Sequence, residues 1–389
     1  MILGIEATSI DRGGGENYLN NLVEYFQPSI QGIDKLVIVS QRSSLSSNID
    51  AKNIELYCPP LLRIRFRVIK YLSRWLWLYF CGKRYYSKKK IDLLLCLSGY
   101  NLTNFPNFIL VVRNNLLLEK PERQRYGLSL AHFRLILLLY LQQKSVNRCS
   151  GIIFLHSYSK ELVFGNKAWH KPSVIIPQRS DLNFWSSRRA VRVANNAARC
   201  IEVVYPSRFE PYKHQLTVLN AAFMLFKAGI ESKMKFIGFE HTPYGDQVLA
   251  KFNEIVQHYP KFKLYVEFHA WKSRGDLLKI YNASDVFLFA STCEAYPQTL
   301  IEGLFTGLPI VASSKRPMSD ILGDAAIYVN PESALSISQG LQKVITDATT
   351  RAYLARKSLR IRKHLGQDDL LVQTYAFISS VVSRSKNGS

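Results

Sequence analysis

The sequence predicts an α/β protein of two Rossmann-like domains, each with a doubly wound parallel sheet. Three observations lead to this prediction. The chain has 389 residues, more than a single hydrophobic core usually supports. In its first half, short apolar runs alternate with longer amphipathic stretches, which is the pattern that builds a parallel sheet. A second and clearer alternation of the same kind begins after residue 200.

The first domain is expected over residues 1–180. Its first strand, residues 2–7, leads into a glycine-rich turn, and apolar residues at helical spacing follow at positions 18–26. The other strands predicted in this domain are residues 35–40, 93–97, 108–112 and 151–155. Between residues 178 and 198 the apolar periodicity lapses, which is typical of an interdomain connection.

The second domain is expected over residues 198–370. The predicted strands are residues 201–205, 234–238, 262–268, 286–290, 309–312 and 326–329. The predicted helices are residues 215–227, 247–257, 275–281, 298–306, 334–346 and roughly 350–380. Residues 371–389 are expected to form a C-terminal helix that can pack back on the first domain.

The amino-acid composition limits which ligands and which cellular compartment are expected. Lys and Arg outnumber Asp and Glu by 51 to 29, which favours polyanionic partners such as nucleic acid, anionic lipid or phosphorylated small molecules. The six cysteines form no C-x-x-C pair, so neither a zinc site nor a disulfide framework is indicated. No apolar run reaches the roughly 20 residues of a spanning helix, and no basic secretory leader begins the chain. A cytoplasmic, soluble or surface-bound protein is expected.

The loop after predicted strand 286–290 carries two glutamates. Ligands of open parallel sheets bind beyond the carboxyl ends of strands. Glu294 lies in the turn there, a helix begins near Pro297, and Glu302 falls in the second turn of that helix, so both carboxylates can face one cleft. Carboxylates accept hydrogen bonds from sugar hydroxyls, and first-turn amides can hold an anion. A capped surface helix is the alternative explanation.

A basic loop follows predicted strand 201–205. Arg208 can hold two phosphate oxygens with its fork of donors, and Lys213 can add a point charge. Together they suit a diphosphate. In a chain with so many basic residues, a solvated loop is the alternative.

Two loops of the first domain are further candidates. Gly13, Gly14 and Gly15 follow the first strand, and consecutive glycines let backbone N–H groups approach a phosphate closely. The turn matches neither a dinucleotide fingerprint nor a Walker loop, so it does not support an oxidoreductase or a nucleotide triphosphate site. Arg113 and Asn114 follow strand 108–112 and could bind a sugar or an acceptor. Plain loop chemistry is the alternative for both.

Residues 291–312 read Ser-x-x-Glu-x-Tyr-Pro-x-x-Leu-x-Glu-Gly-x-x-x-Gly-x-Pro-Ile-Val-Ala. This resembles the glutamate-x7-glutamate signature of retaining glycosyltransferase family 4, whose members have the GT-B fold, two Rossmann-like domains facing across a cleft. Residues 205–214 resemble the Arg/Lys diphosphate loop of that family. Further similar stretches are residues 236–238, 277–286 and 323–331. The resemblance covers nearly all of the second domain, but only the glycine-rich turn and the strand alternation of the first.

The resemblance implies a site and a reaction. Glu302 would bind the donor ribose, Glu294 the transferred sugar, and Arg208 and Lys213 the diphosphate leaving group. The donor-binding set would also include Gly13, Gly14, Gly15, Tyr296, Pro297, Gln298 and Thr299. Arg113 and Asn114, on the sugar or acceptor side, stand where many members have histidine. The family retains anomeric configuration and needs no metal or other cofactor, because basic side chains replace the cation.

The expected partners are a nucleoside-diphosphate sugar and a saccharide or lipid-linked glycan acceptor, as in cell-surface polysaccharide synthesis, without nucleic acid. A non-catalytic protein that binds nucleic acid or a membrane surface is the rival, motivated by the net charge of +22. That rival leaves the ordered motifs of the second domain unexplained.

Residues 61–90 favour peripheral docking on the inner face of an anionic membrane. They contain ten Lys or Arg, no Asp or Glu, and a run of aromatic residues. The alternative is an ordinary basic helix whose Leu72, Leu76 and Phe80 line the domain core.

Overall fold

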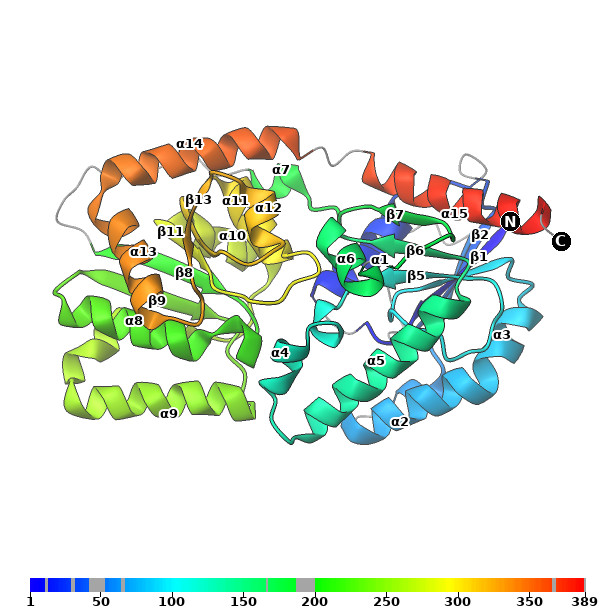
Figure 1. Cartoon of the computed structure of the whole chain (residues 1–389), viewed down its shortest axis with the longest axis horizontal. Helices are drawn as coiled ribbons and strands as arrows, with labels where there is room; N and C mark the ends of the chain where they lie inside the picture. The colour runs from blue at the N-terminus through cyan, green and yellow to red at the C-terminus, as the bar shows by residue number, and fades with distance from the viewer. Residues whose placement is uncertain are drawn as a thin grey trace. The chain divides into compact units, whose positions relative to one another are not determined.

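The computed structural model describes residues 1–10, 13–28, 32–41, 53–63, 67–165, 167–186, 200–365 and 369–387. The chain forms two compact units, each with its own parallel sheet (Figure 1). Unit 1 comprises Met1–Arg123, Gly127–Arg179 and Gln367–Ser389. Unit 2 comprises Gln124–Tyr126 and Ser180–Gly366. The units therefore separate next to the expected boundary at residue 180, whereas residues 187–198 of the expected connection lie outside the described residues.

The sheet of unit 1 has seven parallel strands in the order β3-β2-β1-β4-β5-β6-β7. The strands are β1 (Ile2–Ala7), β2 (Lys35–Ser40), β3 (Ile54–Tyr57), β4 (Leu93–Cys96), β5 (Phe108–Val112), β6 (Gly151–Phe154) and β7 (Ser173–Ile175). Every residue of β4, β5 and β6 is buried, as expected for parallel strands that are covered on both faces.

Helices cover both faces of this sheet (Figure 1). They are α1 (Gly14–Glu24), α2 (Arg67–Trp77), α3 (Lys83–Lys88), α4 (Lys120–Gln124), α5 (Leu130–Arg148), α6 (Ser157–Phe164) and α15 (Leu370–Asn387), with short turns η2 (Pro60–Leu62), η3 (Leu78–Gly82, π-helical) and η4 (Asn115–Leu117). On one face, Trp77, Leu78 and Tyr86 join the core of the sheet. The hydroxyl of Tyr375 in α15 donates to the Leu22 carbonyl of α1, so α15 packs on unit 1.

The sheet of unit 2 has six parallel strands in the order β10-β9-β8-β11-β12-β13. They are β8 (Ile201–Pro206), β9 (Ser232–Ile237), β10 (Val266–His269), β11 (Val286–Phe289), β12 (Ile310–Ser313) and β13 (Ala326–Val329). The order reverses between β8 and β11, which makes this pair the topological switch point of the sheet.

The helices of unit 2 are α7 (Leu182–Trp185), α8 (Gln215–Lys227), α9 (Pro243–His258), α10 (Arg274–Ala283), α11 (Gln298–Thr306), α12 (Met318–Leu322), α13 (Ala334–Thr346) and α14 (Ala348–His364), with turns η5 (Pro211–Lys213) and η6 (Pro260–Tyr265). Gly303 lets α11 lie directly on β11, because a Cβ atom there would come within 2.6 Å of the Phe287 ring. The expectation of two doubly wound α/β domains is confirmed, and each unit has the layered architecture of an open parallel sheet.

Some elements differ from the sequence-based expectation. The strand expected at residues 262–268 is wrong in its first half, where η6 forms and β10 begins only at Val266. Pro260 starts this turn and the fully buried Phe262 packs within it, 5.4 Å between ring centroids from Phe223, so the apolar side chains there serve a turn. The final helix expected at roughly residues 350–380 is two helices, α14 and α15.

Within the described ranges, no helix is both long enough and apolar enough to cross a bilayer.

Candidate active site

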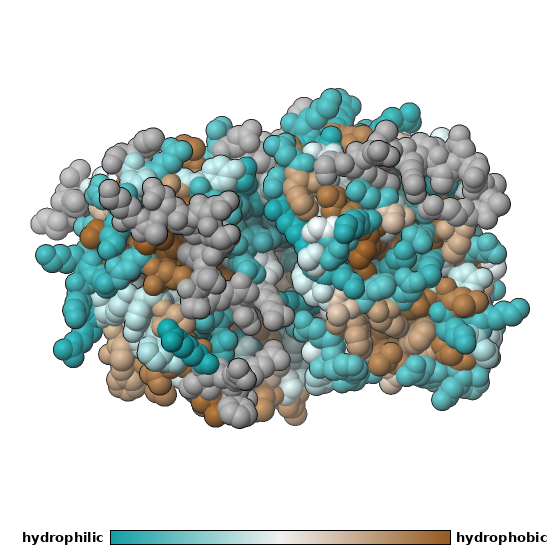
Figure 2. Space-filling model, turned by 180° about the vertical axis from the view of Figure 1, so that it is seen from behind, coloured by the Kyte–Doolittle hydropathy of each residue, from teal (hydrophilic) through white to brown (hydrophobic). Residues whose placement is uncertain are grey.

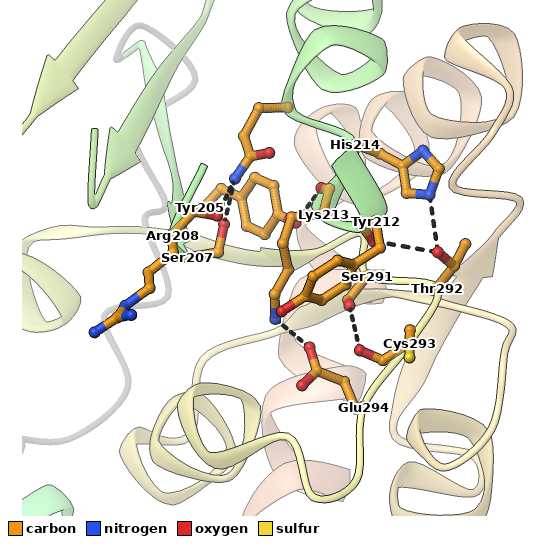
Figure 3. A network of polar contacts seen from close by, with 11 residues as sticks. Tyr205, Ser207, Arg208, Tyr212, Lys213, His214, Ser291, Thr292, Cys293 and Glu294 are labelled. Carbon is orange, nitrogen blue, oxygen red and sulfur yellow. Dashed lines mark hydrogen bonds and ion pairs between the residues drawn. The ribbon is translucent and has the colours of Figure 1, made fainter. Parts of the chain in front are cut away.

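The loops that follow β8 and β11 meet at the switch point of unit 2. They are tied together through Thr292, whose backbone N–H donates to the Tyr212 carbonyl at 2.9 Å. The Thr292 hydroxyl lies 3.1 Å from Nε2 of His214 (Figure 3). These contacts hold the basic loop and the loop with Glu294 in one place, where ligands of such sheets bind.

Lys213 and Glu294 form an ion pair at this point. Only 11% of the lysine side chain and 14% of the glutamate side chain are exposed. The Lys213 ammonium also lies 5.3 Å from the centre of the Phe289 ring. The backbone carbonyl of Lys213 accepts a hydrogen bond from the Tyr205 hydroxyl. A buried cation in a structured loop is not a solvated side chain, so the solvated-loop alternative is wrong for Lys213.

Arg208 behaves differently, although it lies in the same loop. Its side chain is exposed and points away from the Lys213–Glu294 pair (Figure 3). Its backbone is fixed, because Nε2 of Gln215 donates to the Arg208 carbonyl at 2.7 Å and to the Ser207 hydroxyl at 2.9 Å. The structure therefore presents a paired lysine and a solvent-facing arginine on one fixed loop.

Two tyrosine hydroxyls complete the surroundings of the pair. Burial, together with the nearby Glu294 carboxylate, raises the pKa of Tyr205 and of Tyr212 well above 10. Both hydroxyls therefore stay protonated near neutral pH and are able to donate hydrogen bonds.

Glu302 lies in the second turn of α11 and is 6% exposed. Burial raises the pKa of its carboxyl group to about 8, and the Arg274 guanidinium and the Tyr281 hydroxyl offset this only in part. Arg274 is held in place by Asp181, 3.0 Å away, and by the Phe184 ring, 4.1 Å from its guanidinium carbon. In the free protein at neutral pH, the Glu302 carboxyl group is therefore mostly protonated.

The residues at the start of α11 were expected to bind the donor. Pro297 caps the helix, and its carbonyl accepts from the backbone N–H groups of Leu300 and Ile301 at 3.0 and 3.1 Å. Tyr296 is buried and Thr299 is half-buried. Nε2 of Gln298 donates to the Ser180 hydroxyl, while its buried Oε1 has no hydrogen-bond partner among the described residues.

In unit 1 the structure brings together two loops that the sequence pointed to separately. Gly13, with φ 77°, and Gly14 and Gly15 begin α1, and Gly15 lies against Arg113, where a Cβ atom would come within 2.7 Å of Nη2. The Arg113 guanidinium also lies 5.5 Å from the centre of the Tyr18 ring. Burial lowers the pKa of Arg113 to about 10. The neighbouring Asp11 and Arg12 lie outside the described residues.

Asn114 has a local role. Its side-chain oxygen accepts from the Leu116 backbone N–H at 3.1 Å and caps turn η4. This is the plain loop chemistry that the sequence left open for it.

Sequence reasoning missed three residues that shape the site. His214, in a left-handed conformation with φ 56°, links the two loops, Tyr205 fixes the Lys213 backbone, and Arg274 acts on Glu302. His214 directly follows Lys213 in the sequence, which was a usable signal. Nothing in the sequence pattern connected Arg274 with Glu302, because the two lie on different helices.

No group of three or more His, Cys, Asp or Glu side chains that could hold a metal ion occurs in the part of the chain that the structure describes.

Comparisons with known proteins give a family model that matches part of the chain and solved structures that share its fold. Residues 189–360 match the family model described as Glycosyl transferases group 1. A stretch of 99 residues is 24% identical to the O-antigen chain mannosyltransferase B of Escherichia coli, but it covers only 25% of this chain and 26% of that protein.

The whole chain is similar in structure to two solved proteins. One is a sucrose-phosphate synthase from Thermosynechococcus elongatus, with a TM-score of 0.76, 14% identity and 100% of both chains covered. The other is HepE from Anabaena, solved in complex with UDP, with a TM-score of 0.67, 15% identity, and 97% and 99% of the two chains covered. At these identities the likeness shows the fold, which is GT-B.

Proposed function

We propose that the chain is a retaining, metal-independent glycosyltransferase, because it has the GT-B fold and its residues 189–360 match the family model of the group 1 glycosyl transferases. It moves a sugar from a nucleoside-diphosphate sugar to a saccharide or lipid-linked glycan. The HepE structure with UDP supports a nucleotide-sugar donor.

The observation that carries this proposal is the Lys213–Glu294 pair at the switch point of unit 2. As the glycosidic bond to the diphosphate breaks, negative charge grows on the phosphate and positive charge grows at the anomeric carbon. The Lys213 ammonium neutralises the first charge, aided by Arg208, which is exposed and free to turn toward a ligand. The Glu294 carboxylate binds hydroxyls of the transferred sugar.

Glu302 binds the ribose hydroxyls in this proposal, and the start of α11 from Tyr296 to Thr299 lines the donor. The unpartnered Oε1 of Gln298 supplies an acceptor for a donor hydroxyl. In unit 1, Gly13–Gly15 are assigned to phosphate binding and Arg113 to the sugar or acceptor side, whereas Asn114 keeps its local role as the cap of turn η4.

The test is a panel of UDP- and GDP-sugars offered with saccharide and lipid-linked acceptors, followed by the anomeric configuration of the product by NMR. A product with the donor's configuration is the expected result. A product of inverted configuration contradicts the retaining mechanism, and nucleotide-sugar binding without any transfer contradicts the enzymatic role.

Glu294→Gln is expected to slow turnover by roughly 10- to 100-fold and to change nucleotide affinity little, because its carboxylate faces the reacting sugar. That range corresponds to about 1.5–3 kcal/mol for a lost charge-assisted hydrogen bond. The measurement is kcat together with the Kd for the free nucleoside diphosphate. Equal losses in kcat and nucleotide affinity, or no loss in either, count against this assignment.

Chelation is expected to leave activity intact, because Lys213 and Arg208 replace the metal at the diphosphate. The check is the initial rate after extensive EDTA treatment and dialysis, compared with the rate after adding Mg²⁺ or Mn²⁺ back. An activity that disappears with EDTA and returns with a divalent ion contradicts the metal-independent mechanism.

We further propose that the acceptor belongs to cell-surface polysaccharide synthesis and that the enzyme works in the cytoplasm, on the inner face of the membrane. The basic, carboxylate-free sequence of residues 61–90 supports this placement.

A further inference from the structure

Helix α2 of unit 1 carries apolar side chains on its solvent side. Ile69, Leu72 and Leu76 are each at least half exposed, and Phe80 in the adjoining turn η3 is 70% exposed. Spacings of three and four residues place these side chains on one face. The opposite face holds the buried Arg74. This arrangement is the reverse of a helix that packs on a core and faces water.

The alternative in which Leu72, Leu76 and Phe80 line the core of the domain is therefore wrong. Trp77, Leu78 and Tyr86 occupy the core instead. Apolar residues of this segment lie on two faces of the helix. The face with Trp77 packs against the sheet, and the face with Leu72 and Leu76 is exposed.

Helix α5 repeats this arrangement over its first three turns. Leu130 is 88% exposed, and Phe133, Leu137 and Tyr140 on the same face are about half exposed. Its buried side includes the polar Gln142. The last turns of α5 expose polar and basic residues instead, so the apolar face ends within the helix.

The two helices lie next to each other. The guanidinium carbon of Arg134 in α5 is 4.4 Å from the centre of the Tyr71 ring in α2, and Figure 1 shows α2 and α5 side by side. At a rise of 1.5 Å per residue, each apolar face runs for about 15 Å. We call the exposed apolar side chains of residues 61, 69–80 and 128–140 the α2–α5 surface.

The α2–α5 surface concentrates exposed apolar residues to an unusual degree. Of the 21 large hydrophobic residues that are exposed in the described part of the chain, 12 belong to it. Apolar side chains also gather along the lower edge of the left half of Figure 2, which is unit 1 seen from behind. A contiguous exposed patch of this kind marks an interaction surface.

Charge identifies the occupant. Residues 61–90 contain ten Lys or Arg and residues 127–148 contain Arg134, Lys144 and Arg148, and neither segment has an Asp or Glu. A second copy of the chain would bring the same cations to the contact and be repelled. An anionic bilayer instead provides negative headgroups above an apolar interior, which matches both the cations and the apolar side chains.

We propose that the α2–α5 surface inserts into the headgroup region of an anionic bilayer, with both helices in the membrane plane. This goes beyond electrostatic docking of residues 61–90, because α5 contributes five of the 12 exposed apolar residues. It deepens the proposed function, on which it rests for its purpose: the inserted surface brings the enzyme to acceptors linked to lipid.

Vesicle flotation with the full chain tests the role of α5. The probe is vesicles of phosphatidylcholine with roughly one third phosphatidylglycerol. The Leu130→Ser/Leu137→Ser variant keeps every Lys and Arg and is expected to reduce binding ~10-fold or more. The matched control, Leu264→Ser/Leu335→Ser, removes leucines of unit 2 that are 64% and 54% exposed, and is expected to bind like the wild type.

Insertion is tested at Cys81, an exposed residue next to Phe80. A polarity-sensitive thiol dye is attached in a Cys58→Ser/Cys200→Ser background, since the other cysteines are buried. Its emission is expected to shift to the blue with anionic vesicles and to remain shifted when salt is raised after binding. Emission unchanged by vesicles overturns insertion.

Three other results also overturn the proposal. In the first, the α5 variant binds vesicles as well as the wild type does. In the second, the α5 variant changes its oligomeric mass but still binds vesicles. In the third, the protein binds an acidic protein and does not bind vesicles. Sugar transfer to a soluble acceptor, measured without vesicles, distinguishes the failure of membrane insertion from the failure of the proposed function. The α5 variant is expected to retain this activity, and a wild-type protein that floats but transfers no sugar refutes only the proposed function.

Discussion

Replacing Glu302 with glutamine is expected to stabilise the free protein at pH 9 and to leave it nearly unchanged at pH 5. Folding raises the pKa of this carboxyl group from 4.5 to about 8. Below pH 4.5, the folded and unfolded states both hold the proton. Between pH 4.5 and 8 only the folded state holds it, so the free energy of unfolding falls by about 1.4 kcal/mol per pH unit. The total loss is roughly 5 kcal/mol, and glutamine avoids it because it does not ionise.

Nucleotide binding is expected to follow the opposite trend. The ionised carboxylate accepts both ribose hydroxyls, so wild-type affinity for a nucleoside diphosphate should rise from pH 6 to pH 9, with release of a proton on binding below pH 8. Glu302→Gln should lose this pH dependence and bind roughly 10- to 100-fold more weakly at pH 9, which corresponds to about 1.5–3 kcal/mol.

Melting curves and titration calorimetry at pH 5, 7 and 9 provide both measurements. Glu240→Gln, which changes an exposed carboxylate of the same unit, serves as the control and should follow the wild type. If the wild type and Glu302→Gln show parallel pH profiles of stability, the buried carboxyl group is not the titrating one. If only their binding profiles are parallel, Glu302 does not hold the ribose.

Removing Lys213 should impair both activity and stability, whereas removing Arg208 should impair activity alone. In each case a positive charge that offsets the leaving diphosphate is lost, and turnover should fall by roughly 100- to 1,000-fold. Lys213→Ala also leaves Glu294 without its partner in a mostly buried place. Since both side chains retain some solvent contact, the expected loss in unfolding free energy is about 1–3 kcal/mol. Arg208 is exposed, and its alanine variant should melt like the wild type.

A double-mutant cycle separates the two effects of Lys213. Lys213→Ala/Glu294→Gln should regain much of the stability, because no unpaired charge remains, but none of the activity. The measurements are thermal melting and product formed per folded molecule. A destabilised Arg208→Ala, or a Lys213→Ala protein with wild-type turnover per folded molecule, contradicts these roles.

The strongly periodic parts of the fold were predictable. Helices Gln215–Lys227, Gln298–Thr306 and Ala334–Thr346 begin and end where the apolar pattern indicated, because each buries one continuous face. Strands β3 and β7 have no fully buried residue. They lie at the two edges of their sheet. Neither strand was predicted, because a short edge strand lacks the continuous apolar run that indicates a buried strand.

The site was predictable as a place but not as a geometry. The rule that ligands bind beyond the carboxyl ends of strands pointed to the loops with Lys213 and Glu294, and the strand order of the structure makes these loops neighbours. The geometry depends on contacts between side chains that are distant in the sequence. Examples are the Lys213–Glu294 ion pair and the effect of Arg274 on Glu302. The local apolar periodicity does not predict such contacts, nor the outward direction of Arg208.

Helix α15 has a consequence for biosynthesis. Its residues Tyr375, Ile378 and Val381 are buried in unit 1, whose other segments end at Arg179. The ribosome must therefore translate all of Ser180–Gly366 before unit 1 can close, and growing chains emerge at roughly 5–20 residues per second. The continuous Ser180–Gly366 segment can fold first, while the apolar surface of unit 1 that α15 covers stays exposed for roughly ten seconds or more. During that interval, nascent chains are expected to need chaperone protection at this surface rather than in unit 2.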